Sequence, residues 1–348
     1  MCCASKSIEQ TAQQKEAMKQ PSVSIVMSVH NGARYLTPAV ISVLRQKLTD
    51  WEMIIVNDGS TDGTNCILQQ MARDDARIRI VNLAEKGGLA AALNAGISSA
   101  TAPLIARMDA DDIMHPDRLS QQVRFLRKHP EIGIVGSDAY LIDENSQVAG
   151  YLSMPCSDWH IRWIEASTLS TGLIHPSVVF RRCILAEAQL AYDPAFRAAQ
   201  DKNLWAQFLR TTRAANIPKP LLYYRRHTGS ISGGKRDEQR AFAESVLRRE
   251  TERRLQRPLS EEEWRLLTDG DRTLFGRQFR QMLCKAMAPE WSSLRDASRA
   301  AVAARNTVSL RLARRARILI NAGIWRVRVL HKPGWLSAIL DWRWENDK

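Results

Sequence analysis

The chain has 348 residues, of which 45% are hydrophobic and 25% charged, a balance typical of a folded globular protein and not of a disordered or fibrous one. No apolar run reaches the ~18 residues of a membrane-spanning helix, and residues 1–20 lack the apolar core of a signal peptide, so we expect a disordered N-terminal tail and a cytoplasmic protein. The net charge of +13 is concentrated in residues 235–348, where 25 Lys and Arg stand against 15 Asp and Glu, and this excess favours an anionic partner.

Short apolar runs alternate with helical stretches between residues 22 and 107. Strands are predicted at 24–29, 51–56, 78–81 and 103–106. Helices are predicted between them, at 33–48, 62–74 and 89–98. Repeated βα units of this length indicate an α/β fold, in which a mostly parallel, Rossmann-like sheet carries helices on both faces.

The pattern becomes less regular after residue 112. A helix is predicted at 116–129 and strands at 132–135 and 139–142, with further short elements up to residue 224. Residues 229–234 are rich in Gly and Ser and suit a linker, and the sequence beyond it is helical. There Ser260 and Glu263 have the spacing of a capping box, which marks a helix start.

Three regions are therefore expected after the tail. An α/β unit at 21–234 divides into halves of about 21–112 and 113–234, and a basic helical region follows at 235–348.

Polar residues follow the first two predicted strands. In parallel α/β sheets, ligands bind at the carboxyl ends of the strands. His30, Asn31 and Gly32 follow the first strand, and Gly32 would let the backbone approach a base or a phosphate. Asp58 follows the second strand and can accept a hydrogen bond from a base nitrogen, whereas Asp62 suits the cap of the next helix. Each feature alone also fits an ordinary βα turn.

Three carboxylates follow the fourth strand, in the run Asp109-Ala110-Asp111-Asp112. Such carboxylates repel one another when partly buried, and a divalent cation removes that cost. Mg²⁺ and Mn²⁺ prefer a few carboxylates together with phosphate oxygens of a substrate. The alternative is a solvated acidic turn, but the position directly after a buried strand favours a metal site.

Two later segments carry further candidates. Asp201, in QDKNLW, opens a predicted helix and is either a reactive carboxylate or an acid stabilised by the helix dipole. His227 lies in RRHTGSIS, whose cationic and hydroxyl side chains suit a diphosphate and a metal.

Together these residues resemble the inverting glycosyltransferase family 2, whose catalytic domain has the GT-A fold. The resemblance covers about residues 21–232 and rests on the order and spacing of seven fragments. These are SIVMSVHNGARYL, IIVNDGSTDGT, GGLAAALNAGI, ARMDADDIMHPDRL, HPSVVFRR, QDKNLW and RRHTGSIS. It implies transfer of a sugar from a nucleotide-sugar donor, UDP-linked on family grounds, to a saccharide or lipid-linked saccharide hydroxyl. Bacterial cell-surface polysaccharide, lipopolysaccharide or capsule synthesis is the implied context.

The resemblance also implies a role for each candidate residue. The nucleotide sugar would be bound by His30, Asn31, Gly32, Asp58, Asn94, Arg107, Asp109 and Asp112. The metal, Mg²⁺ or Mn²⁺, would be held mainly by Asp111, with Asp109 and His227. Asp201 would be the catalytic base, and His175, Gln200 and Trp205 would lie on the acceptor side. A single base opposite the leaving diphosphate gives direct displacement with inversion.

Three departures from the family pattern bear on these roles. Many relatives have an aromatic residue in place of His30, which changes how the base stacks. Many have Arg before Asn94, where this chain has Leu93, so Arg107 would supply that positive charge. Gln200 replaces a frequent Glu, which leaves Asp201 with one acidic neighbour fewer.

The segment 309–321, SLRLARRARILIN, forms an amphipathic helix on a helical wheel, with four arginines on its polar face. With the tryptophans that follow, it suits either an anchor at an anionic membrane surface or a helix packed on the catalytic domain.

Other functions fit the sequence less well. A nucleotidyltransferase would share the nucleotide-binding architecture but leaves Asp201 and His227 without a role. A nucleic-acid-binding protein would fit the charge, but zinc-finger spacing and RNA-binding aromatic motifs are missing, so no nucleic acid is expected as a partner. A catalytically inactive protein that binds sugar nucleotides would not require Asp109, Asp111 and Asp201, which are all present in this chain.

Overall fold

The computed structural model describes residues 20–227, 236–269 and 274–287. Three expectations from the sequence lie outside these ranges: the N-terminal tail up to residue 19, the linker at 229–234 and the amphipathic segment 309–321. Among the described helices, none combines the length and the apolar character that a membrane crossing requires.

The first half of the chain forms a parallel sheet, as predicted. Strands β1 (Val23–Val29), β2 (Trp51–Asn57), β3 (Ile78–Asn82) and β4 (Leu104–Asp109) lie in the order β3-β2-β1-β4, and each neighbouring pair is parallel. The connecting helices are α2 (Ala33–Leu44), α3 (Thr64–Asp74) and α4 (Gly88–Ser99). Helix α2 is shorter than predicted because the backbone N–H of Lys47 donates to the carbonyl of Pro116 and not along the helix, while the side chain of Gln46 also bonds to His115 and Leu119.

The second half joins the same sheet with mixed strand directions. It contributes β5 (Ile113–Met114), β6 (Ile132–Ile142), β7 (Val148–Leu152), β8 (Val179–Arg181) and β9 (Arg213–Arg225), and the sheet continues β4-β8-β6-β9-β5. Only β6 and β9 pair in parallel here, while the pairs β4–β8, β8–β6, β9–β5 and β6–β7 are antiparallel. The predicted α/β fold is confirmed. The strands of the first half are all parallel, and the second half adds one parallel pair, β6–β9. The two strands predicted at 132–135 and 139–142 form one irregular strand, β6, whose register shifts near Ser137 and Asp138.

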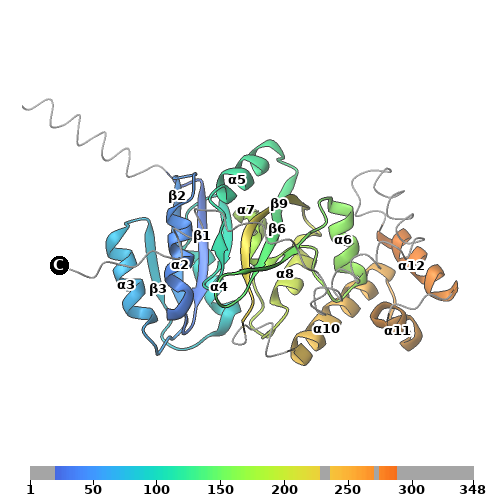
Figure 1. The fold of residues 1–348 in the computed structure, drawn as a ribbon. Coiled ribbons are helices and arrows are strands. Elements are labelled where there is room, and N and C mark those ends of the chain that lie inside the picture. Colours follow the sequence, from blue (N-terminus) through green and yellow to red (C-terminus); the bar gives the residue numbers. More distant parts are fainter. Residues whose placement is uncertain (1–19, 228–235, 270–273, 288–348) are drawn as a thin grey trace, which may run out of the picture.

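Helices cover both faces of the sheet, and the alternation of side chains along each strand explains why (Figure 1). Odd-numbered residues of β1, such as Ile25 and Met27, pack with α2, α3 and α5 (Arg118–Lys128). Val26, on the opposite face, packs with α4, and the same core includes side chains of α6 (Asp158–Ser167), α7 (Arg182–Glu187) and α8 (Gln200–Phe208). A short 3-10 helix, η1 (His175–Ser177), precedes β8.

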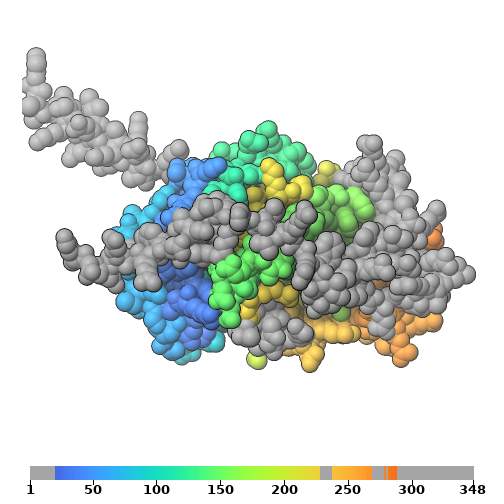
Figure 2. All heavy atoms as spheres, viewed as in Figure 1, coloured from blue at the N-terminus to red at the C-terminus, as the bar shows by residue number. Residues whose placement is uncertain are grey.

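The last three described helices gather at the end of the molecule remote from β3 (Figure 1). They are α10 (Arg236–Leu255), α11 (Glu261–Asp269) and α12 (Leu274–Met287). Trp163 and Ala166 of α6 pack against Leu247, Leu283 and Met287, so a separate apolar cluster joins these helices to the α/β unit. The space-filling view shows the same succession, from the blue first βα units to the orange C-terminal helices (Figure 2).

The predicted capping box is present at the start of α11. The backbone N–H of Glu263 donates to Ser260 Oγ at 3.2 Å, and the N–H of Ser260 donates to Glu263 Oε2 at 3.0 Å. Arg257 also forms a two-armed ion pair with the same carboxylate, at 2.8 and 2.5 Å. Chiefly through this ion pair, the pKa of Glu263 falls from its ordinary value of 4.5 to about 2.

Replacing Glu263 by Gln should therefore destabilise the protein in a pH-dependent way. Gln can keep the capping box but loses the charge. Because the pKa is depressed in the folded state, the ionised carboxylate stabilises the fold above pH ~4.5 and this stabilisation is lost as pH falls toward ~2. We expect Glu263→Gln to lower the free energy of unfolding at pH 7 and to match the wild type near pH 2, as measured by urea denaturation. Glu261→Gln, which loses only an exposed ion pair with Arg248, is the control and should have little effect at any pH.

Candidate active site

The ends of β1 and β2 are joined by hydrogen bonds between the residues predicted to bind the base. His30 Nδ1 lies 2.8 Å from the carbonyl oxygen of Asp58. Asn31 adopts a positive φ of 52°, and its side-chain oxygen accepts the N–H of Thr61 at 2.8 Å. Gly32 follows, and a Cβ there would lie 2.5 Å from Val29 Cγ2, so the turn requires glycine. The first two βα turns therefore form one connected surface.

The carboxylate of Asp58 holds the start of α4. It accepts the N–H of Gly87 at 2.6 Å and that of Gly88 at 3.0 Å, and Gly88 has a φ of +82° that favours glycine. Only 3% of Asp58 is exposed, but a carboxylate has about four acceptor sites, so a contact with a base remains open to it. Asp62 was predicted to cap the next helix, but Gly63 is the residue at the cap position of α3; Asp62 lies one position earlier and accepts the N–H of Thr64 at 3.0 Å.

The acidic cluster lies at the carboxyl end of β4. One oxygen from each of Asp109, Asp111 and Asp112 lies within 4.8 Å of the others. Arg107 and Asp109 are two residues apart on the same strand, so they share a face, and Arg107 Nη1 lies 2.5 Å from Asp109 Oδ2. The guanidinium is 3% exposed, and its Nε has no hydrogen-bond partner among the described residues. A buried cation with a free donor therefore stands beside the cluster.

Strand β9 and the residues after it bring two more side chains to the cluster. His227 Nε2 lies 3.0 Å from Asp111 Oδ2. Arg225 donates its backbone N–H to Asp112 Oδ1 at 2.8 Å and its Nε to the carbonyl of Asp111 at 2.7 Å. The structure thus brings His227 and the predicted metal ligands together, although more than a hundred residues separate them in the sequence.

The electrostatics of the cluster fit a divalent cation. Burial, and then the charge of Asp109, raises the pKa of Asp111, which His227 partly offsets. Burial also raises the pKa of Asp112 well above its usual value, with Asp111 and Asp109 adding to the effect. Asp112 Oδ2 is buried without a hydrogen-bond partner among the described residues. A bound cation would lower the cost of these neighbouring negative charges.

Asp201 lies in the first turn of α8, facing the same region. Ala199, just before the helix, has a left-handed backbone with a φ of 54°, so the chain turns sharply into α8. Asp201 is half-buried, and its Oδ1 accepts the N–H of Lys202 at 2.8 Å. Burial raises the pKa of Asp201, the charge of Glu165 adds to this, and Arg107 and Lys202 oppose it. Arg107 thus acts electrostatically on Asp201 while it pairs with Asp109.

The three residues expected on the acceptor side are all buried in the structure. His175 is buried, and its Nε2 lies 2.7 Å from the hydroxyl of Tyr192, while burial and then Arg107 lower its pKa well below the usual value. Gln200 is 7% exposed at the start of α8. Trp205 is fully buried among Phe180 and other rings, so its indole shapes this region from within the core and has no surface for an acceptor.

The side-chain amide of Asn94 forms hydrogen bonds within the protein, to the backbone of Tyr192. Its amide donates to the carbonyl of Tyr192 at 2.7 Å and accepts the N–H of Tyr192 at 3.0 Å. The Asn94 side chain thus holds the backbone of Tyr192 in place, and its contact with the donor stays a prediction.

Tyr192 and Arg118 are site residues that the sequence analysis missed. Tyr192 is 1% exposed and interacts electrostatically with Arg107, Asp201 and Asp109. It lies in an irregular segment with no periodic pattern, so no sequence signal marks it. Arg118 is fully buried, donates to the carbonyl of Arg107 at 2.8 Å, and has its pKa lowered by burial to about 9. Its place in MHPDRL, directly after the acidic cluster, was the one available signal.

Comparison with known proteins matches residues 24–180 to the model of Glycosyl transferase family 2. The putative teichuronic acid biosynthesis glycosyltransferase TuaG of Bacillus subtilis is 42% identical over 217 residues, which are 62% of this chain and 83% of TuaG. Among solved structures, S. aureus TarS 1–349 in complex with UDP-GlcNAc has a TM-score of 0.55 at 16% identity, covering 84% of this chain and 92% of TarS 1–349. The mannosyltransferase PcManGT of Pyrobaculum calidifontis, in complex with GDP-Man and Mn²⁺, has a TM-score of 0.52 at 17% identity, covering 92% of this chain and 86% of PcManGT.

Proposed function

Because this chain belongs to glycosyltransferase family 2, we propose that it transfers a sugar from a nucleoside diphosphate sugar to a saccharide hydroxyl by metal-dependent, inverting displacement. The observation that carries this proposal is the division of the acids into two groups. Asp109, Asp111 and Asp112 cluster at the end of β4, whereas Asp201 stands alone on α8. Arg107 interacts electrostatically with members of both groups.

The acidic cluster would hold the donor diphosphate through Mg²⁺ or Mn²⁺. Asp111 and Asp109, with His227 beside them, offer a carboxylate and imidazole ligand set suited to such an ion. When bound, the ion would offset the negative charge that develops on the leaving diphosphate. Arg107 Nε would donate to a phosphate oxygen, and His30, Asn31, Gly32 and Asp58 would line the place of the base.

Asp201 would take the proton from the attacking hydroxyl. Its raised pKa, caused chiefly by burial, makes it a stronger base than an exposed aspartate. Asp201 is separate from the cluster that would hold the leaving group. A base on the opposite side of the sugar would direct the hydroxyl to the back of the breaking bond, which inverts the configuration at the anomeric carbon.

We further propose a UDP-linked donor and an acceptor that is part of a cell-surface polysaccharide, free or lipid-linked. TarS binds UDP-GlcNAc and TuaG is named for teichuronic acid biosynthesis, which supports both choices. A panel of UDP-, GDP- and dTDP-sugars should be screened for nucleotide release with Mn²⁺, with Mg²⁺ and with EDTA. We expect release from a UDP-sugar only in the presence of metal; equal release in EDTA would refute the metal-dependent mechanism.

We also propose that the segment 309–321 binds anionic membrane, which would bring the enzyme to a lipid-linked acceptor. Each of Arg311, Arg314, Arg315 and Arg317 would contribute about 1 kcal/mol at an anionic surface. Co-sedimentation with anionic liposomes should be strong at low salt and weaker at high salt, because salt screens surface charges over ~8–10 Å. Changing the four arginines to Gln should weaken binding and leave donor hydrolysis intact. Binding that ignores both lipid charge and these changes would argue for a helix packed on the enzyme.

A further inference from the structure

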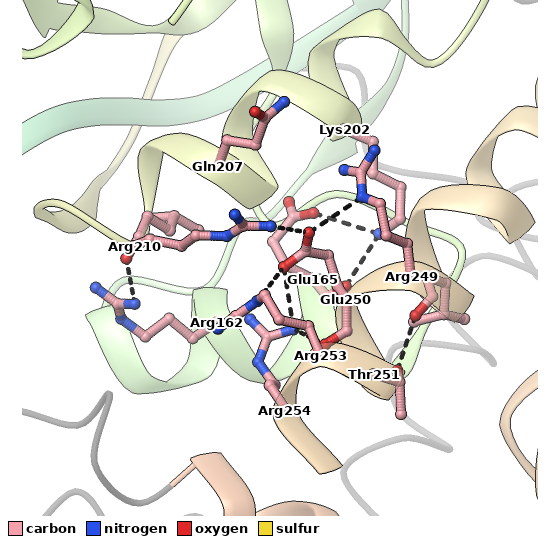
Figure 3. A network of polar contacts seen from close by, with 12 residues as sticks. Arg162, Glu165, Lys202, Gln207, Arg210, Arg249, Glu250, Thr251, Arg253 and Arg254 are labelled. Carbon is pink, nitrogen blue, oxygen red and sulfur yellow. Dashed lines mark hydrogen bonds and ion pairs between the residues drawn. The ribbon is translucent and has the colours of Figure 1, made fainter. Parts of the chain in front are cut away.

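The two residues that follow Asp201 are polar and almost completely buried. Lys202 is 2% exposed and Asn203 is 1% exposed. Burial of such groups is costly unless each is hydrogen-bonded. Lys202 bonds to Glu165 of α6, and Asn203 bonds to Arg249 of α10. Figure 3 shows Lys202, Glu165 and Arg249 in this network.

Helix α6 holds α8 at both ends. Near the start of α8, Lys202 Nζ donates to the carbonyl of Ser170 at 2.9 Å and lies 3.3 Å from Glu165 Oε2. Beyond its end, Arg162 donates to the carbonyls of Leu209 and, at 2.7 Å, Thr212. These contacts come from within the α/β unit.

Helix α10 holds α8 at both ends as well. Arg249 Nη2 donates to Asn203 Oδ1 at 2.8 Å, near the start of α8. Glu250 is 1% exposed and pairs with Arg210, which lies just beyond the end of α8. Burial alone would raise the pKa of Glu250, but Arg210, followed by Arg254 and Arg253, lowers it overall. Glu250 therefore stays ionised and joins α10 to α8 (Figure 3).

We propose that α10 is a positioning element of the active site, in which Arg249, through Asn203, fixes the direction in which α8 presents the carboxylate of Asp201. The inference rests on the proposed role of Asp201 as the base. Helix α10 lies beyond residues 24–180, which match the family model, so this control of the base belongs to the C-terminal helices of this chain. Arg249 is a positioning residue and does not touch the reacting atoms.

At Arg249, an effect on the position of the Asp201 carboxylate can be distinguished from an effect on the stability of the fold. The side chain of Arg249 is 45% exposed, and Glu250, its partner in an ion pair, still has Arg210 and Arg253 as partners when Arg249 is replaced. In contrast, a displacement of about 1 Å in a catalytic group can cost ~10²-fold in rate. Asn203 is two residues from Asp201, and its backbone N–H donates to the carbonyl of Ala199, the residue with the left-handed backbone, at 3.1 Å. A loss of this contact should therefore change the rate of transfer more than the stability of the fold.

The test compares Arg249→Ala with Arg253→Ala. Arg253 lies on the same helix and pairs with Glu250 at 3.1 Å, as Arg249 does at 3.3 Å, while the hydrogen bond to Asn203 comes from Arg249. We expect Arg249→Ala to lower kcat roughly tenfold with an unchanged KM for the nucleotide sugar and an unchanged Tm. Arg253→Ala should keep wild-type kcat, and Arg249→Lys, whose ammonium can still donate to Asn203, should recover part of the loss.

A double-mutant cycle with Asn203→Ala completes the test. If the two residues act through their hydrogen bond, the double variant should be no slower than Asn203→Ala alone. Wild-type kcat in Arg249→Ala would overturn the inference, and so would equal losses of kcat in Arg249→Ala and Arg253→Ala. If Asp201→Asn is nevertheless slow, the proposed function stands. Full transfer by Asp201→Asn would instead overturn the base assignment and this inference with it.

Discussion

Replacing Asp201 by Asn should reduce sugar transfer by about two to four orders of magnitude, because general-base assistance is worth ~10²–10⁴ in rate. Asn has nearly the same shape and can still accept the N–H of Lys202, so α8 should keep its start. Binding of the nucleotide and of the metal should survive, since Asp201 is not part of the acidic cluster. The measurement is kcat for transfer, alongside calorimetry of UDP with Mn²⁺.

The pH dependence offers a second readout of the same variant. In the wild type, kcat should rise with pH as Asp201 loses its proton, over a range above the pKa of an exposed aspartate because burial raises it. Asp201→Asn should lose this rise along with its rate. Asp193→Asn is the matched control, since Asp193 lies near Tyr192 and accepts only a local N–H from Ala195, at 2.9 Å. Near wild-type transfer in Asp201→Asn would mean that another group removes the proton.

Replacing Asp111 by Ala should abolish metal-dependent binding of the donor. Asp109 is paired with Arg107, and Asp112 directs one oxygen to the N–H of Arg225, so neither can take the position of Asp111 beside His227. Calorimetry should show that Mn²⁺ no longer increases the affinity for UDP. Asp117→Ala, which removes a carboxylate paired with the surface Lys47, is the control and should bind UDP as the wild type does. Unchanged metal-dependent affinity in Asp111→Ala would rule out a metal site at this cluster.

The ranges of the first four strands, their parallel direction and the location of the site could be predicted from the sequence because all three depend on local patterns. Apolar runs followed by Gly, Asn and Asp mark buried strands and the turns at their carboxyl ends. Parallel pairing then places Asp58 and the acidic cluster along one edge of the sheet. The distant contact between Asp111 and His227 followed from the resemblance to a known family and not from the pattern itself.

The rest depended on tertiary contacts that have no local signature. The mixed second half could not be predicted because short antiparallel strands such as β8 carry only three residues. The side chain of Asn94 is turned to Tyr192 by a hydrogen bond across 98 positions of the chain. Trp205 was expected on the acceptor side from the family resemblance, but its indole is fully buried and packs against Phe180 in the core.

The long parallel pairing of β6 with β9 bears on how the protein folds. Ile132 pairs with Arg213 and Ile142 with Arg225, so the chain must close a large loop before this part of the sheet can form. Such non-local contacts are formed slowly, and during synthesis β6 would wait with an open edge until the ribosome has released β9. His227 follows β9 directly. A nascent chain would therefore bring His227 to the acidic cluster only after β9 has been synthesised and paired with β6, so a chain released before that point would lack part of the proposed metal site.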